Sequence, residues 1–202
     1  MTTQQESDTA ELFPISSGDL AALRVRLAAE AERSGVLDIA YRTVESPIGR
    51  LLLAATSKGL VRVAFEREGF DRVIESLASR VGPRILEAPA RLDAVATELD
   101  EYFGGTRRAF DVPLDFAMST GFRVVVQRYL PQIDYGHTQS YKEVAELVGN
   151  ARAVRAVGTA CATNPLPVVV PCHRVVRSDG ALGGYLGGIE AKTTLLELER
   201  AA

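Results

Sequence analysis

Apolar positions recur at helical spacing near the start of the chain. Four of them are separated by three or four residues, as on one face of a helix: Leu20, Leu23, Leu27 and Ala31. Gly35 then supplies a stop signal, so one amphipathic helix is predicted here. Residues 1–14, which precede it, are mostly polar and are expected to be loose.

From residue 39 onward the apolar positions form short runs rich in β-forming residues. Three such runs are separated by turn signals and predict an antiparallel meander: 39–44, 51–55 and 60–65. Two helical stretches, 71–80 and 90–103, and a strand-like piece, 109–116, follow. Together these segments are typical of a small α+β unit.

The pattern becomes helical again after Ser119. One apolar face ends before Pro131, within the predicted helix 120–129. The sequence from Ser140 to Glu143 has the form of a capping box and opens a helix through Leu147.

After the break at Gly149, Asn150 is expected to cap a second helix, from 151 to about 161. The pair is a candidate helix-turn-helix; the alternative is two packed helices without a ligand, which is the commoner outcome of such a pattern taken alone.

The fold class predicted from these patterns is α+β. A small N-terminal domain with an antiparallel sheet and helices is expected over 37–117. A mostly helical C-terminal domain with the helix-turn-helix is expected over 118–202, and 1–36 form an N-terminal extension with one amphipathic helix.

Charge and composition narrow the classes of function. The net charge of −3 excludes a protein that coats nucleic acid by bulk electrostatics, so DNA binding requires a local basic patch. The stretch 140–192 has six positive and four negative residues, a net +2. No run is long and apolar enough to span a membrane, and the first residues lack a secretory pattern, so a cytoplasmic protein is expected.

The predicted second helix carries two long cations among small residues. Arg152 and Arg155 lie three positions apart, which would place them on one face. Small neighbours such as Ala153 allow a backbone to approach a duplex while the arginines reach phosphates or a gap in the base stack. This composition favours DNA binding.

The candidate chemistry lies in the run from Pro171 to Arg174. Cys172 is expected at the end of a short buried strand, 168–170, with His173 as the base that takes its proton. An isolated cysteine is more often a small buried hydrophobe, but Pro171, His173 and the cationic Arg174 favour a reactive thiol. With two cysteines and two histidines, no structural zinc site and no cofactor are expected.

The segment after this run contains a glycine-rich loop, 183–188, and a final predicted helix, 190–199. The loop lacks the Gly-Lys-Ser/Thr ending of a nucleoside triphosphate site. A flexible wall for a planar base is the favoured interpretation, and a plain surface loop is the alternative.

These residues resemble the O6-alkylguanine-DNA alkyltransferases, or methylated-DNA-protein-cysteine methyltransferases. The resemblance is carried by Asn164-Pro165-x-Pro167-x-x-x-Pro171-Cys172-His173-Arg174-Val175, preceded by 153–158 and followed by Gly187-Gly188 and 192–199. It is strong over about 135–199, looser over 39–116 and absent before Leu37.

The resemblance implies a stoichiometric, single-turnover DNA repair enzyme. A helix-turn-helix would bind the minor groove of double-stranded DNA, and the alkylated guanine would be flipped into a pocket. Cys172 would then accept the alkyl group from O6-alkylguanine, with O4-alkylthymine as an alternative substrate. A monomer without metal or membrane partner is implied.

The resemblance also implies roles for individual residues. Cys172 would be the acceptor, His173 would relay its proton through water, and Glu199 would orient His173. The positions implied at the flipped base are Tyr141, Asn164, Val175, Tyr185 and Lys192. Those implied at the DNA are Arg155, as the finger that fills the gap, with Arg152, Ala153 and Ala162.

The sequence departs from the family pattern at several positions. The helix over 120–129 lacks the usual tryptophan, Leu186 replaces a small residue, and Ala162 replaces a frequent cation. Cys161 replaces an apolar residue and is interpreted as a small hydrophobe. Two rival functions are a DNA-binding damage sensor without transfer, which Cys172 disfavours, and a cysteine hydrolase, which would not explain the arginines.

Overall fold

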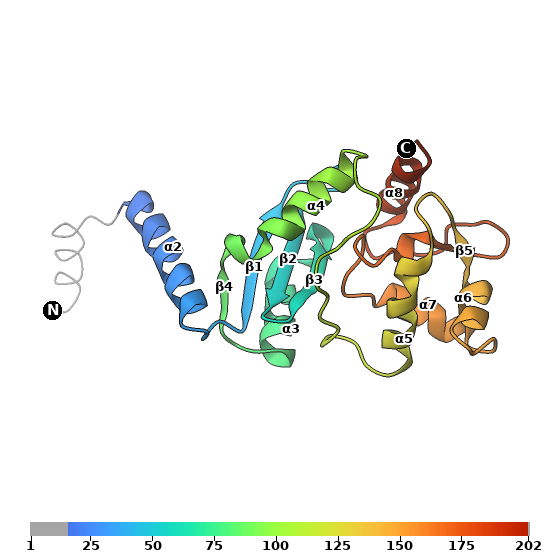
Figure 1. Cartoon of the computed structure of the whole chain (residues 1–202), viewed down its shortest axis with the longest axis horizontal. Coiled ribbons are helices and arrows are strands. Elements are labelled where there is room, and N and C mark those ends of the chain that lie inside the picture. The colour runs from blue at the N-terminus through green and yellow to red at the C-terminus, as the bar shows by residue number, and fades with distance from the viewer. Residues whose placement is uncertain (1–15, 202) are drawn as a thin grey trace, which may run out of the picture. The chain divides into compact units, whose positions relative to one another are not determined.

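The computed structural model describes residues 16–201 and divides the chain into two compact units, Met1–Leu37 and Asp38–Ala202 (Figure 1). In the first unit, helix α2 (Ser17–Arg33) begins at a capping box in which the Asp19 amide donates to Ser16. Gly35 follows with φ +64°, a conformation that suits glycine. The predicted N-terminal helix is confirmed, and the prediction for residues 1–14 lies outside the described residues.

The second unit contains a four-stranded sheet in the order β3-β2-β1-β4. Strands β1 (Ile39–Val44), β2 (Leu51–Thr56) and β3 (Gly59–Phe65) pair in antiparallel fashion, as the meander predicted. The short strand β4 (Ile85–Glu87) pairs in parallel with β1 and was not predicted. Three residues after a Gly-Pro turn give too little periodicity to identify a strand.

Helices cover both faces of this sheet. Side chains of β2 alternate between two clusters, because successive residues of a strand point to opposite faces. Leu51 and Leu53 face a large core that includes α4 (Asp93–Phe103), whereas Leu52 and Ala54 pack with α3 (Phe70–Arg80). Short 3₁₀ helices, Glu66–Glu68 and Pro89–Leu92, precede α3 and α4.

The strand predicted over 109–116 is wrong. This segment makes only an isolated parallel bridge between Leu114 and Leu60. Pro113 has no amide proton to donate, so it cannot continue a ladder, although its carbonyl accepts from the Leu60 amide at 2.8 Å.

The remaining elements are mostly helical (Figure 1). They are α5 (Phe122–Tyr129), α6 (Tyr141–Leu147), α7 (Val154–Ala162) and α8 (Ile189–Ala201), with 3₁₀ turns Leu130–Gln132 and Cys172–Arg174. Two short strands, β5 (Gln139–Ser140) and β6 (Val175–Val176), pair in parallel. The predicted α+β fold class, with a sheet part and a helical part, is confirmed.

Helix α6 begins where the capping box predicted, since the Glu143 amide donates to Ser140 Oγ at 3.2 Å. Helix α7, however, begins at Val154 and not after Asn150. The Ala153 amide donates to the Asn150 carbonyl at 2.9 Å, so residues 150–153 form a turn. Arg152 therefore lies in this turn, and the prediction that it shares a helix face with Arg155 is wrong.

The strand predicted over 168–170 is also wrong, although the segment is buried. Its hydrogen bonds are local, with the Val170 amide donating to the Leu166 carbonyl at 2.8 Å. Val168 adopts φ +73°, an unusual conformation for a β-branched residue that costs on the order of 1–3 kcal/mol. Cys172 thus follows a strained buried loop and precedes β6.

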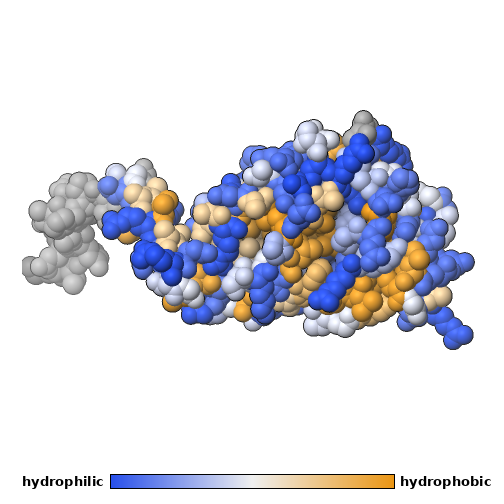
Figure 2. Space-filling view, viewed as in Figure 1, coloured by the Kyte–Doolittle hydropathy of each residue, from blue (hydrophilic) through white to orange (hydrophobic). Residues whose placement is uncertain are grey.

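One continuous core joins the sheet to the helical part. It contains β2 and β3 residues, Leu99 and Tyr102 of α4, and residues from α5, α6, α7 and α8. Figure 2 shows hydrophobic surface over α5 and α7, where Val125 and Val154 are exposed. Within 16–201, none of the helices has the length and apolar character needed to cross a membrane.

Candidate active site around Cys172

Cys172 opens a 3₁₀ turn, and its side chain is buried, with 3% of the residue exposed. The Asn164 side chain holds it in place. Asn164 Nδ2 lies 3.2 Å from Cys172 Sγ and donates to the Val170 carbonyl at 2.8 Å. Asn164 Oδ1 accepts from the Leu166 amide at 3.1 Å, so one buried amide fixes both ends of the loop before the thiol.

The next residue, His173, is fully buried and contacts the last helix. His173 Nε2 lies 2.8 Å from Glu199 Oε1. A carboxylate only accepts hydrogen bonds, so Nε2 carries the proton and the neutral ring presents Nδ1 as an acceptor. Nδ1 is buried and has no hydrogen-bond partner among the described residues. This nitrogen is therefore available as a base.

Besides His173, three other residues donate hydrogen bonds to the Glu199 carboxylate. Arg174 Nε donates to its Oε2 at 2.9 Å and Arg174 Nη2 to its Oε1 at 2.9 Å. Tyr102 donates its hydroxyl to Oε1 at 2.7 Å, and the Gly136 amide donates to Oε2 at 3.2 Å. The buried carboxylate is thus fully paired, which makes it a fixed negative charge behind the histidine.

These contacts set the protonation states of the site. Burial tends to raise the pKa of Glu199, but hydrogen bonds from His173 and Arg174 and their charges outweigh it and lower the pKa to about 2. Burial lowers the pKa of His173 below its ordinary value, and Glu199 only partly opposes this. Near neutral pH the site contains an ionised glutamate and a neutral histidine.

The thiol itself is protonated in this state. Burial raises the pKa of Cys172 to about 11, against the opposing effects of the Asn164 hydrogen bond and the Lys192 charge. The expected activation by Arg174 is not direct, because the guanidinium is bound to Glu199 and to the Ile133 carbonyl. Deprotonation of Cys172 therefore requires transfer of its proton to a neighbouring base.

The residues predicted at the substrate lie around the same thiol. Lys192 is fully buried and donates from Nζ to the Val175 carbonyl at 2.6 Å and to the Leu182 carbonyl. Burial lowers the pKa of Lys192. The Tyr185 ring lies 6.4 Å from the His173 ring, and burial raises the pKa of its hydroxyl.

Tyr141, the first residue of α6, is half-buried and contacts the glycine-rich loop. Burial raises the pKa of Tyr141, and the nearby thiols of Cys161 and Cys172 add to this effect. A side-chain carbon at Gly183 would lie 3.0 Å from the Tyr141 hydroxyl. The loop therefore approaches the tyrosine so closely that only glycine fits without a shift.

The residues predicted at the DNA lie on one exposed region. Arg155 and Ala162 are exposed on α7, and Arg152 and Ala153 lie in the preceding turn. The opposite face of α7, with Val157, Ala160 and Cys161, is buried. The structure thus separates these four residues from the buried network and places them on α7 and on the turn that precedes it; α7 ends next to Asn164.

Two parts of the network were not predicted from the sequence. Tyr102 and the Gly136 amide reach Glu199 from positions 97 and 63 residues away. Tyr102 follows Leu99 by three positions and therefore fits the pattern of a core residue. No local pattern reveals its partner.

A buried thiol beside a histidine and a paired glutamate is the class of site that activates a cysteine nucleophile. Residues 39–116 match the family description "6-O-methylguanine DNA methyltransferase, ribonuclease-like domain". Residues 121–201 match "6-O-methylguanine DNA methyltransferase, DNA binding domain". The chain belongs to the 6-O-methylguanine DNA methyltransferase family.

Individual relatives agree with this assignment. The inducible methylated-DNA–protein-cysteine methyltransferase of Bacillus subtilis is 40% identical over 151 residues, covering 74% of this chain and 84% of that protein. Its counterpart in Mycolicibacterium paratuberculosis is 43% identical over 162 residues, covering 80% and 93%. The crystal structure of Mycobacterium tuberculosis OGT in complex with DNA is 39% identical, with a TM-score of 0.71 and coverage of 80% and 93%.

Proposed function

We propose that this protein repairs DNA by direct, single-turnover transfer of an alkyl group from O6-alkylguanine to Cys172, with O4-alkylthymine as an alternative substrate. The observation that carries the proposal is the arrangement behind the thiol. His173 directs Nε2 toward Glu199 at 2.8 Å and keeps Nδ1 unpaired among the described residues. This is the orientation a base needs in order to take the proton of a neighbouring thiol.

In this proposal the Cys172 proton passes to His173 Nδ1 through a water molecule. The thiolate sulfur attacks the alkyl carbon, a carbon–sulfur bond forms, and the bond between that carbon and O6 breaks. The electron pair of the broken bond stays on the guanine, which takes up one proton. The product thioether is not hydrolysed, so each protein molecule reacts once.

The raised pKa of Cys172, about 11, supports this order of events. A thiol that stays protonated in the empty site is protected from other electrophiles, because the thiolate is the nucleophile. Glu199 stabilises the histidinium that forms, since its carboxylate is fixed by Arg174 and Tyr102.

We assign the remaining site residues to the flipped base. Tyr141 and the pair of Tyr185 and Lys192 would donate toward the base and its leaving oxygen. The Cys172 and Val175 backbone would read the exocyclic amine. The Val175 carbonyl already accepts from Lys192 at 2.6 Å, and its second lone pair leaves room for one more donor. Asn164 links α7 to the thiol.

We assign DNA contact to α7 and the turn before it. Exposed Val154, Ala156 and Ala162 are short, which lets the helix backbone approach the minor groove. Arg155 would fill the gap left by the extruded base, and Arg152 and Ala153 would lie at the phosphates. In this division, residues 118–202 bind DNA and transfer the alkyl group. Residues 37–117 support the core, and residues 1–36 are an N-terminal extension.

We further infer a monomer that acts in the cytoplasm on double-stranded DNA. The hydrogen bonds that hold His173 and Glu199 are complete within a single copy of the chain, so the proposed site needs no residue from a second copy. Cys161 and Cys172 are both free, which supports a reducing compartment.

The proposal is tested by mixing the protein with excess duplex that contains O6-methylguanine and measuring the guanine restored by nucleoside analysis. One guanine per protein molecule is expected, with no further conversion on longer incubation. Cys172→Ala should restore none while still binding the duplex. Restoration by Cys172→Ala, or conversion far beyond one equivalent, would contradict the proposal.

A further inference from the structure

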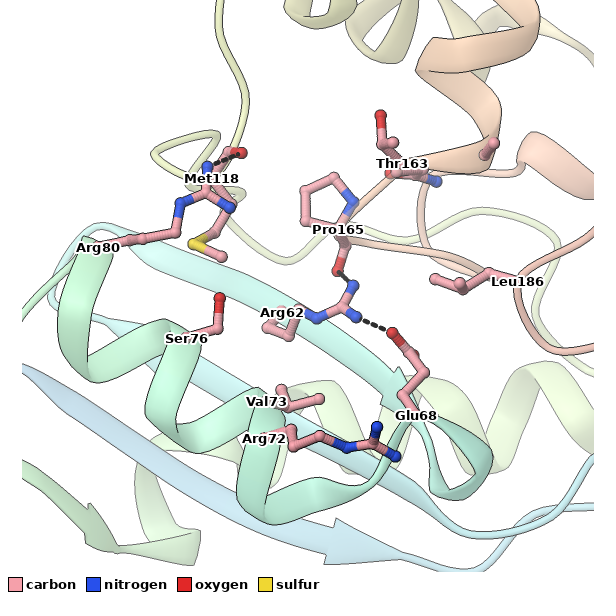
Figure 3. Close-up of a pocket in the computed structure, with 12 residues that line it drawn as sticks. Arg62, Glu68, Arg72, Val73, Ser76, Arg80, Met118, Thr163, Pro165 and Leu186 are labelled. Atoms are coloured by element: carbon pink, nitrogen blue, oxygen red, sulfur yellow. Dashed lines mark hydrogen bonds and ion pairs between the residues drawn. The ribbon is translucent and has the colours of Figure 1, made fainter.

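A cavity of about 340 Å³ lies between helix α3 and the segment that follows α7 (Figure 3). Helix α3 contributes Arg72, Ser76 and Arg80, which are spaced by four and so form one stripe along the helix. The opposite wall comes from the end of α7 and the loops beyond it: Ala162, Thr163, Asn164, Pro165 and Leu186.

Positive charge is concentrated in this cavity. Arg62, Arg72 and Arg80 line it together with one acidic residue, Glu68, so its formal charge is three minus one, or +2. The whole chain carries −3. A recess of this sign in an acidic protein favours an anionic ligand.

The three arginines of the cavity differ in how many hydrogen bonds and ion pairs they already make within the protein. Arg62 is bound to Glu68 and donates to the Pro165 carbonyl at 3.3 Å, so this pair is a fixed part of the wall. Arg80 donates from Nη2 to the Met118 carbonyl at 2.8 Å, and its other N–H groups remain available to a ligand. Arg72 has no hydrogen bond or ion pair with any described residue (Figure 3). Two guanidinium groups are therefore available to an anion.

The cavity adjoins the reactive site. Asn164 lines it and at the same time places Nδ2 at 3.2 Å from Cys172 Sγ. Ala162 and Thr163, also in its wall, are the exposed end of the helix assigned to DNA. A strand that follows α7 and delivers a base to Cys172 would pass this cavity.

The length of the stripe matches a polyanion better than a single small anion. Arg72 and Arg80 are eight residues apart, or about 12 Å along a helix. One DNA strand rises about 3.4 Å per nucleotide, so the stripe has the length of roughly three to four nucleotide steps. We propose that Arg72 and Arg80 bind backbone phosphates of the lesion-bearing strand, so that α3 forms a second DNA contact. This inference rests on the proposed function.

The test compares Arg72→Gln and the double variant Arg72→Gln/Arg80→Gln with Arg84→Gln. Arg84 precedes β4, at the opposite edge of the sheet from β3, so its variant loses a charge far from the cavity. Affinity for an O6-methylguanine duplex is measured by fluorescence anisotropy in a Cys172→Ala background over a range of KCl concentrations. Inorganic phosphate serves as a competitor. Transfer from the free base O6-benzylguanine, which has no phosphates, is measured with Cys172 intact.

The double variant should bind the duplex roughly tenfold more weakly, with a plot of log affinity against log salt that is shallower by about 1 to 2. Arg72→Gln alone should show part of this change, and all variants should react with the free base at the rate of the unmodified protein. If the plot of log affinity against log salt had the same slope for the double variant as for Arg84→Gln, the inference would be overturned. Phosphate competition without a change in slope would overturn the DNA assignment in favour of a small anion.

Failure of the proposed function would look different. In that case the unmodified protein would take no alkyl group from the duplex or from the free base. A protein that repairs the duplex normally, with variants of unchanged slope, would overturn the phosphate contact alone.

Discussion

At the residue scale, the site is defined by where protons are held. Cys172 keeps its proton, His173 has a free Nδ1, and Glu199 stays ionised among its donors. The carboxylate is buried with Arg174, so each depends on the other for neutralisation. The network is therefore both the proposed catalytic arrangement and a stabilising feature of the fold.

Glu199→Gln tests this dependence. The amide preserves the size of the side chain but leaves buried Arg174 without its counter-charge, so the free energy of unfolding should fall by about 3–5 kcal/mol. The rate of alkyl transfer should also fall, because His173 loses the group that orients it. Urea unfolding and single-turnover kinetics measure the two effects. Glu197→Gln, on the exposed side of the same helix, is the control and should change neither.

The same network predicts how stability depends on pH. The pKa of His173 is lowered from 6.5, so below that pH the unfolded chain binds a proton that the folded protein excludes. The pKa of Glu199 is lowered from 4.5 to about 2, so between these pH values the unfolded chain again binds a proton that the folded protein does not. The free energy of unfolding should therefore decrease from about pH 6.5 downward. An increase in stability between pH 7 and pH 5 would contradict these protonation states.

The sequence identified the residues of the site better than the hydrogen bonds between them. Cys172 and His173 were predicted as nucleophile and base from their sequence neighbourhood, and Glu199 was assigned through the resemblance. The structure places Glu199 Oε1 at 2.8 Å from His173 Nε2. Tyr102 was missed, since a core aromatic and a carboxylate partner give the same sequence pattern until the fold is known. Arg174 was noticed only as a cation beside the thiol, whereas its hydrogen bonds go to Glu199.

At the element scale, the site depends on short irregular segments more than on regular strands. The loop before Cys172 is shaped by Asn164, and the glycine-rich loop packs against Tyr141. Sequence patterns predicted the helices and the meander, because several residues share one periodicity there. They failed over 168–170, where a buried apolar run is stabilised by local turns.

Gly183→Ala tests the contact between the loop and α6. The added carbon would lie 3.0 Å from the Tyr141 hydroxyl, and φ +69° disfavours alanine. Transfer from duplex DNA should slow about tenfold as the loop shifts, with a small loss of melting temperature. Gly184→Ala is the matched control, because nothing lies within 4 Å of its added carbon and its φ is not in the left-handed region. Equal rates for the two variants would exclude this contact as a constraint.

At the scale of the whole molecule, the sheet and the helical part share one core, and every residue of the proposed site lies in Asp38–Ala202. The family matches likewise cover only 39–116 and 121–201. The sequence predicted the α+β class but not how tightly the parts are joined. That junction depends on contacts such as Tyr102 to Glu199, between residues far apart in the chain.

Removal of residues 1–36 should therefore leave alkyl transfer intact. The shortened protein should repair O6-methylguanine duplex at a rate within about twofold of the full chain, because the buried network keeps all its partners. Single-turnover repair and thermal unfolding of the two proteins provide the comparison. A loss of repair in the shortened but folded protein would show that the extension takes part in the reaction.

Mass spectrometry after reaction with O6-methylguanine duplex shows whether the alkyl group moves to Cys172. Trypsin releases residues 156–174 as one peptide that contains both Cys161 and Cys172, so fragmentation must locate the added mass. One methyl group is expected on Cys172 and none on Cys161. A methyl group on Cys161, or an unmodified peptide after the lesion has been repaired, would contradict transfer to Cys172.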